Sequence, residues 1–138
     1  MRRAFGIICL IALSAIAALP LGGRVAAQQH GVEAPDWQAQ PIRLMMVEQA
    51  GCIYCARWDA EIAPGFAKSA EGRQAPLMRV DIDGPWPDGI VLDSRPVITP
   101  TFILLDRGVE LDRIEGYVGA KYFYPVLAER MQQAGLGS

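Results

Sequence analysis

Two cysteines at C-x-x-C spacing, Cys52 and Cys55, constrain the fold of this chain more than any other feature. The apolar run before them, residues 42–48, predicts a strand buried on both faces of a sheet. After Cys55, apolar residues recur every three or four positions, which is the spacing of a helix. Cysteines at such a junction can alternate between dithiol and disulfide. The pattern predicts thiol-disulfide exchange. A structural disulfide is the alternative, although so small a ring stabilises a fold by only about 2 kcal/mol.

The first 27 residues have the features of a secretory signal peptide. A basic start at Arg2 and Arg3 precedes an apolar run over 4–19, and small residues at 25–27 suit a signal peptidase. We therefore expect cleavage before Gln28 and export to the periplasm. An uncleaved membrane anchor is the alternative, because the apolar run approaches the roughly 17 residues that can span a bilayer.

The mature chain that this cleavage would leave is acidic. Three of the 13 basic residues lie in the leader and all 15 acidic residues follow it, which leaves ten basic residues and a formal charge of −5. Cys9 is also removed, so Cys52 and Cys55 are the only cysteines that remain. An acidic domain without a basic run gives no reason to expect a nucleic acid as partner.

The rest of the chain predicts one α/β domain over 42–138, after an extended lead-in at 28–41. A Pro-Gly pair interrupts the helix that follows the cysteines. Residues 90–97 fit either a short helix or a loop. Three further strands and a closing helix are expected at 77–83, 98–106, 109–116 and 120–134. The first of these strands should pair in parallel with 42–48, and the last two should form a hairpin. The expected fold is a four-stranded mixed sheet with helices on both faces.

A position at a helix N-terminus gives the two cysteines different roles. Free backbone N–H groups and the positive end of the helix dipole stabilise a thiolate there and lower a cysteine pKa toward about 7. We therefore expect Cys52 to be the exposed nucleophile and Cys55, one turn further on, to resolve the mixed disulfide. Gly51 leaves the approach to Cys52 open, and Ile53 and Tyr54 influence the reduction potential and face the substrate.

A second candidate element is Thr99-Pro100, which opens the predicted strand at 98–106. In this topology that strand end lies beside the helix N-terminus. A cis proline there would present the Thr99 backbone to an extended segment of the substrate. An ordinary trans proline at a strand start is the alternative, because only about 5% of such bonds in folded proteins are cis.

From about residue 42 to residue 131 the chain resembles the thioredoxin superfamily. Three motifs carry this resemblance: Gly51-Cys52-Ile53-Tyr54-Cys55, Thr99-Pro100-Thr101-Phe102 and Gly116-Tyr117-Val118-Gly119. Together with the leader, the run from Cys52 to Asp59 is similar to the small periplasmic thioredoxins linked to bacterial sulfur oxidation, the SoxS type. The short N-terminal part implies a reduced, glutaredoxin-sized version of the fold.

The resemblance implies a cis bond at Pro100, Cys52 as nucleophile, and reduction of a protein disulfide or a blocked cysteine in the periplasm. A membrane thiol-disulfide carrier would supply the electrons. For the sulfur-oxidation type, the resemblance implies reactivation of a carrier protein that holds sulfur on a cysteine.

The chain also departs from the family pattern. The buried aspartate that assists classical thioredoxin would fall near Met46, which cannot move a proton. Glu48 is the nearest carboxylate in sequence and is the candidate for a proton relay through water, with a solvated strand-end charge as the alternative. Trp86 is a candidate contact for the substrate, and a place in the core or in a lid is the alternative.

The sequence predicts no cofactor beyond the cysteine pair. Its single histidine, His30, leaves a zinc site short of ligands, and no nucleotide or haem motif is present. Two other functions remain open at this point. One is an oxidase or isomerase of disulfides, and the other is a redox-inert binding module or regulatory subunit.

Overall fold

The structure is a computed structural model that describes residues 34–137. The predicted signal peptide, His30 and the first part of the lead-in lie outside the described residues. The last part of the lead-in forms a turn in which the Asp36 side chain accepts hydrogen bonds from the backbone N–H groups of Gln38 and Ala39. Within residues 34–137, no helix has the length and apolar character needed to cross a membrane.

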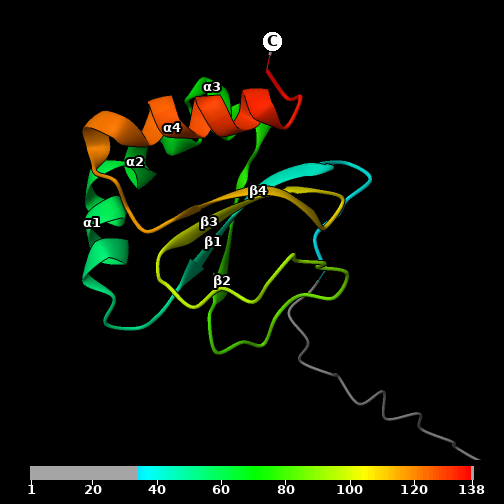
Figure 1. The fold of residues 1–138 in the computed structure, drawn as a ribbon, viewed down its shortest axis with the longest axis horizontal. Coiled ribbons are helices and arrows are strands. Elements are labelled where there is room, and N and C mark those ends of the chain that lie inside the picture. The colour runs from blue at the N-terminus through cyan, green and yellow to red at the C-terminus, as the bar shows by residue number, and fades with distance from the viewer. Residues whose placement is uncertain (1–33, 138) are drawn as a thin grey trace, which may run out of the picture.

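Four strands form one mixed sheet in the order β2-β1-β3-β4 (Figure 1). The strands are β1 (Ile42–Glu48), β2 (Leu77–Asp81), β3 (Thr101–Asp106) and β4 (Val109–Glu115). β1 pairs in parallel with β2, whereas the pairs β1–β3 and β3–β4 are antiparallel. The predicted four-stranded mixed sheet is confirmed.

The two central strands are the most buried part of the sheet, as their continuous apolar sequences predict. Residues 44–47 of β1 and 101–105 of β3 are all buried. β3 begins at Thr101 and not at residue 98 as predicted, since Pro100 has no N–H to donate to a neighbouring strand. The segment 90–97 is a loop that makes one bridge, between Val91 and Val109.

Four helices complete the described fold: α1 (Ile53–Glu61), α2 (Ala63–Phe66), α3 (Ala70–Gln74) and α4 (Ala120–Gln133). The predicted interruption after α1 is present, with Pro64 in the first turn of α2. The side chain of Ser69 caps α3 by accepting the N–H of Gly72 at 2.9 Å.

An aromatic core joins the helices to one face of the sheet. Trp58 of α1 is fully buried, and its ring centroid lies 5.4–5.9 Å from those of Phe66, Phe102 and Phe123. These rings come from α1, α2, β3 and α4. Large buried aromatic side chains dominate the packing energy of a core. Trp58 therefore fixes α1 to the sheet one turn after Cys55.

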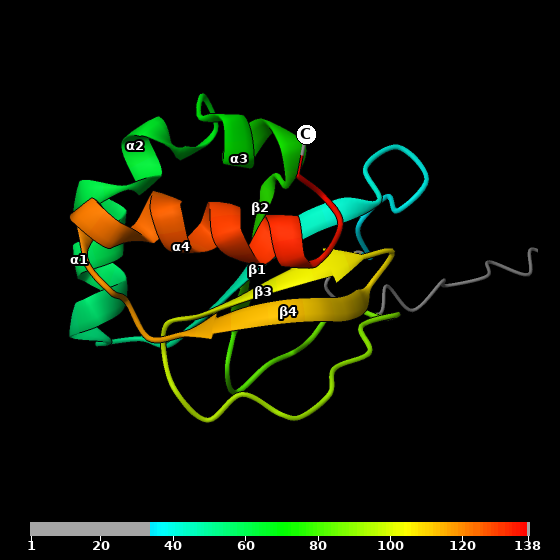
Figure 2. The same cartoon turned by 45° about the horizontal axis from the view of Figure 1, so that its top comes forward.

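The opposite face of the sheet is covered by irregular chain. There Met45, Val47, Val80, Ile103 and Leu105 are buried beneath the partly buried side chains of Trp37, Met78, Ile82, Trp86, Ile90 and Leu92. Figure 2 shows the four helices on one side of the sheet and the segment that joins β2 to β3 on the other. The prediction of helices on both faces is therefore wrong. A sheet face needs apolar cover, and side chains from a proline- and glycine-rich segment supply it here without a helix.

Candidate active site

The two cysteines form a disulfide at the N-terminus of α1, with their Cα atoms 5.3 Å apart. Cys52 is the N-cap, and its Sγ accepts the backbone N–H of Cys55 at 3.1 Å. Cys52 is partly exposed, whereas Cys55 is only 5% exposed and belongs to the core. The two cysteine residues thus differ in exposure in the direction that their predicted roles require. A free N–H of the first helical turn is directed at Cys52.

The residues around the cysteines are open to solvent. Gly51 has a φ of +78°, and apart from Gly51 itself and its two chain neighbours no heavy atom lies within 4 Å of where its Cβ would stand. Ile53 is 73% exposed and Tyr54 is 52% exposed. These three residues therefore lie at the surface beside Cys52, where sequence analysis placed substrate contacts.

A cavity of about 300 Å³ opens beside the cysteine pair. It is lined by Glu48, Gln49, Gly51, Cys52, Ile53, Cys55, Ala56 and Asp59. Glu48, the candidate proton relay, is therefore brought to the site. The cavity also contains Asp59, one helical turn after Cys55, which sequence analysis did not select. Two carboxylates share this cavity with both sulfurs.

Arg79 of β2 holds the two carboxylates together. Its Nη2 lies 2.9 Å from Oε2 of Glu48 and also binds Oδ1 of Asp59. Its guanidinium lies 5.8 Å from the ring centroid of Trp58, and its Nη2 lies 3.5 Å from Sδ of the buried Met46. Burial opposes the charge of Arg79, but the carboxylates outweigh this effect and raise the pKa of the guanidinium. Arg79 therefore stays charged.

Asp59 and Arg79 were not predicted as site residues because they lie 20 positions apart in the chain. One signal was present in the sequence. The parallel pairing of β1 with β2 sets Arg79 opposite Met46, near which the buried aspartate of classical thioredoxin would fall. A cation at that place indicates that it has an anionic partner nearby.

Thr99 and Pro100 lie next to the cysteine loop. Val47 near the end of β1 pairs with Thr101 at the start of β3, so the residues that precede Thr101 lie beside the chain that leads into Cys52. The Thr99–Pro100 peptide bond is cis. The carbonyl of Pro100 accepts the N–H of Gly116 at 2.8 Å, which ties this corner to the end of β4.

Trp86 does not join the cysteine cavity. It packs on the helix-free face of the sheet and lines a different cavity with Pro87, Ile90, Leu92, Ser94 and Arg95. Its Nε1 is directed at the carbonyl of Ile82, 3.4 Å away. Trp86 thus lies like a lid over this face of the sheet, which was the alternative to a substrate contact. Without its side chain, the apolar sheet face beneath it would be exposed to solvent.

The loop after β4 is tied to the end of α1. The hydroxyl of Tyr117 donates a hydrogen bond to Oε2 of Glu61 at 2.6 Å. Burial and this hydrogen bond raise the pKa of Tyr117 to about 12. The same hydrogen bond, together with the guanidinium of Arg57, lowers the pKa of Glu61. The loop at 116–119 is thereby held against the helix that carries the cysteines.

The described residues 34–137 contain no group of three or more His, Cys, Asp or Glu side chains that could hold a metal ion. The groups available for chemistry at the site are the disulfide, the backbone N–H of Cys55 that is directed at Cys52, and the carboxylates of Glu48 and Asp59, which Arg79 bridges.

Comparisons with known proteins identify the family. No family model and no curated protein matched the chain. Among solved structures, the periplasmic thioredoxin SoxS from Paracoccus pantotrophus, in its reduced form, is 49% identical with a TM-score of 0.66. The match covers 67% of this chain and 98% of that chain.

Two further solved structures are more distant. A Trxlp protein from Edwardsiella tarda is 21% identical over 69% of this chain and 96% of that chain, with a TM-score of 0.45. A thioredoxin from Fasciola hepatica is 18% identical over 66% of this chain and 82% of that chain, with a TM-score of 0.44. The match to SoxS identifies the family, since it covers 98% of that chain at 49% identity. With its four-stranded mixed sheet and its C-x-x-C disulfide at a helix N-terminus, the chain belongs to the thioredoxin superfamily and is a thiol-disulfide oxidoreductase.

Proposed function

We propose that the protein works in the periplasm and reduces a disulfide, or a blocked cysteine, on a partner protein. The unequal exposure of the two cysteines carries this proposal: Cys52 is partly exposed at the helix end, and Cys55 is buried behind it. The identity of 49% to a periplasmic thioredoxin supports the compartment, as does the signal peptide predicted for residues 1–27. A membrane thiol-disulfide carrier would return the pair to the dithiol after each turnover.

The reaction takes two exchange steps, and each forms one S–S bond while it breaks another. In the first step the thiolate of Cys52 attacks the partner's disulfide, which forms a mixed disulfide and releases one partner thiolate. In the second step the thiolate of Cys55 attacks Sγ of Cys52 and releases the other partner thiolate. Two electrons pass to the partner, and the Cys52–Cys55 disulfide is the oxidised product.

Glu48 is proposed to take the proton that Cys55 loses before the second step. The thiol of Cys55 is buried, and the cavity beside it contains the carboxylates of Glu48 and Asp59. A carboxylate at this place can accept a proton through one water molecule. The neutral variants Glu48→Gln and Asp59→Asn are expected to slow the second step, whereas Glu129→Gln on α4 is the control. Equal rates in all variants would contradict the relay.

The substrate is proposed to lie across the open surface beside Cys52. The backbone of Thr99 would pair with an extended segment of the partner, with Gly51, Ile53 and Tyr54 around it. The exposed side chains of Ile53 and Tyr54 suit an apolar residue of the partner near its disulfide. By its likeness to SoxS, we propose that the partner is a sulfur-oxidation carrier protein with a blocked cysteine.

Trapping with Cys55→Ser in the native periplasm tests this function. Without the resolving thiol, Cys52 should hold its partner as a mixed disulfide that can be isolated and identified. Cys52→Ser is the matched control and should trap no partner. A carrier protein among the trapped partners supports the proposed substrate, and the absence of any trapped partner counts against the function.

The reduction potential decides the direction of the reaction. A potential of about −200 mV or lower supports a reductase, whereas a value near −120 mV, typical of the strong oxidants of this superfamily, would replace it with an oxidase. The potential is measured by equilibration of the protein with glutathione redox buffers. If the disulfide stayed oxidised until the protein unfolded, a structural role would follow instead.

A further inference from the structure

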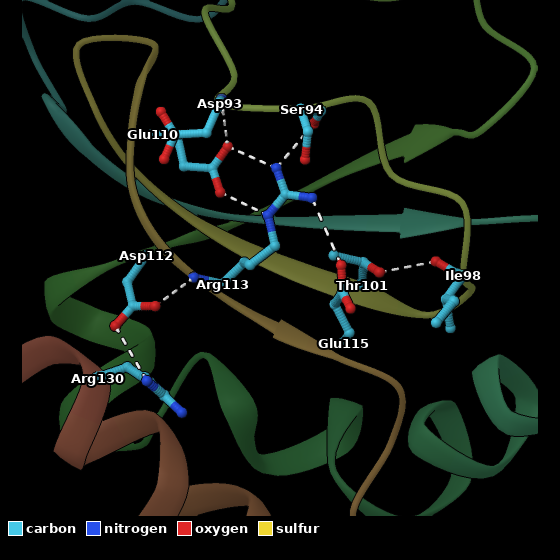
Figure 3. Close-up of polar contacts among 9 residues, drawn as sticks. All are labelled: Asp93, Ser94, Ile98, Thr101, Glu110, Asp112, Arg113, Glu115 and Arg130. Atoms are coloured by element: carbon cyan, nitrogen blue, oxygen red, sulfur yellow. Dashed lines mark hydrogen bonds and ion pairs between the residues drawn. The ribbon is translucent and has the colours of Figure 1, made fainter.

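A buried ion pair on β4 lies apart from the cysteine cavity. Nε of Arg113 lies 2.6 Å from Oε1 of Glu110, and its Nη2 lies 2.7 Å from Oε2 of the same carboxylate. The side chain of Glu110 is 3% exposed and that of Arg113 is 15% exposed. The two parallel hydrogen bonds form the bidentate geometry that gives arginine–carboxylate pairs a fixed orientation (Figure 3).

A bulge in the sheet makes this pair possible. Glu110 and Arg113 are three residues apart, and in a regular strand such residues point to opposite faces. The pairing of β3 with β4 shifts register between Leu104 and Leu105, where Leu111 is the extra residue. The extra residue changes the alternation of side chains by one position. The bulge therefore brings Glu110 and Arg113 to the same face.

Two atoms of this ion pair, Oε2 of Glu110 and Nη2 of Arg113, also bind the loop that leads to Thr99 and Pro100. Oε2 of Glu110 accepts the backbone N–H of Asp93 at 2.9 Å, and Nη2 of Arg113 donates to the carbonyl of Ser94 at 2.8 Å. Just upstream, Val91 exchanges two backbone hydrogen bonds of 2.9 Å with Gly108 and Glu110. Residues 91–94 are thus fastened along the edge strand β4. Figure 3 shows the contacts of Asp93 and Ser94.

The other end of the loop is fastened by a separate hydrogen bond. Oγ1 of the fully buried Thr101 donates to the carbonyl of Ile98 at 2.7 Å. Between the two fixed ends, Val97 is 81% exposed and Ile98 is 46% exposed. These apolar side chains immediately precede Thr99-Pro100, which lies beside the cysteine loop. Two exposed apolar residues are thus held in place next to the proposed substrate surface.

A contribution to stability alone does not account for this arrangement. A buried ion pair contributes little net stability, since desolvation of the two charges offsets their attraction. Burial raises the pKa of Glu110, but the hydrogen bonds from Arg113 and from the N–H of Asp93 outweigh it and lower that pKa. Glu110 therefore stays charged, and the pair keeps its hold on the loop backbone.

We propose that Glu110 and Arg113 are positioning residues for recognition of the protein substrate. They hold the loop so that Val97 and Ile98 form a preformed apolar contact for the residues of the partner that flank its disulfide. This inference rests on the proposed reduction of protein disulfides. It assigns to the ion pair an effect on the binding of a protein and no effect on thiol chemistry itself.

The test compares a protein disulfide with a small one. Insulin is reduced by the protein with dithiothreitol as electron donor, and the small aromatic disulfide DTNB is mixed with the pre-reduced protein after dithiothreitol has been removed. Arg113→Lys keeps the charge but loses the bidentate geometry and the bond to Ser94. We expect KM for insulin to rise about tenfold, the effect of one charge-assisted hydrogen bond, with kcat and the DTNB rate unchanged. Arg130→Lys is the matched control. Arg130 of α4 forms an ion pair with Asp112 of β4, the strand that also carries Arg113, but it is not bonded to the loop.

A second variant keeps the proposal testable if Arg113→Lys fails to fold. The double variant Val97→Ser, Ile98→Ser changes only exposed side chains and should also raise KM for insulin without a change in the DTNB rate. An unchanged KM in either folded variant, or an equal loss with both probes, overturns the inference. If the wild-type protein reduces neither probe, the proposed function fails first. If it reduces both and the variants match it, only this inference fails.

Discussion

Thr101→Val isolates one hydrogen bond in the corner beside the active site. Valine has the shape of threonine but cannot donate, so the carbonyl of Ile98 loses the bond of 2.7 Å that Thr101 provides. An unpaired buried acceptor costs about 1–3 kcal/mol. Because Ile98 is 46% exposed, water can reach its surroundings, and we expect the lower end, about 1 kcal/mol. For a domain of this size, that loss lowers Tm by about 4–8 °C.

Thermal unfolding of the oxidised protein, followed by circular dichroism, measures this effect. Thr99→Val is the matched control. Within residues 34–137 the Thr99 side chain makes no hydrogen bond, so removal of its hydroxyl should leave Tm unchanged. A Tm for Thr101→Val within about 1 °C of wild type would refute the reasoning, as 1 kcal/mol corresponds to several degrees. An equal decrease in both variants would also refute it, because the cause would then not be the bond to Ile98.

Three further changes test other parts of the site. Gly51→Ala should lower the free energy of unfolding by about 1 kcal/mol, because alanine is strained at a φ of +78° even though there is space for its side chain. Urea unfolding measures this loss, and a stability equal to that of the wild type would contradict the expected strain. Arg79→Met should cost about 1 kcal/mol, since its ion pairs are 30–43% exposed, and a loss above about 3 kcal/mol would contradict the small value expected for exposed pairs. Tyr117 has a raised pKa of about 12, so the stability that its neutral form contributes is present below pH 10 and is lost as the pH rises toward 12. In an alkaline titration followed by ultraviolet absorbance, Tyr117→Phe should remove a phenol that ionises near pH 12, and an unchanged titration would contradict its hydrogen bond to Glu61.

Local patterns in the sequence determined the centre of this protein. Continuous apolar runs specify β1 and β3 as buried central strands, and a proline after α1 ends the first helix. The C-x-x-C pair lies between a strand and a helix, so its place at a helix N-terminus follows from neighbouring residues alone. For these features the physical cause lies within a few residues of the chain, and periodicity and turn chemistry therefore predict them.

Only the tertiary structure decided which distant groups meet. Arg79 joins Glu48 to Asp59 because parallel pairing of β2 with β1 sets it beside α1, and no local period encodes that contact. The ion pair of Glu110 with Arg113 depends on a one-residue bulge. If side chains alternated strictly between the two sheet faces, the two residues would lie on opposite faces and could not pair. The side chains that cover the second sheet face also come from distant parts of the chain. Burial of a sheet face requires apolar side chains, and these can come from a loop as well as from a helix. Local sequence thus specifies the cysteine pair and the helix that follows it. Tertiary packing specifies the charged groups beside the cysteines, Glu48, Asp59 and Arg79, and the position of the loop that precedes Thr99.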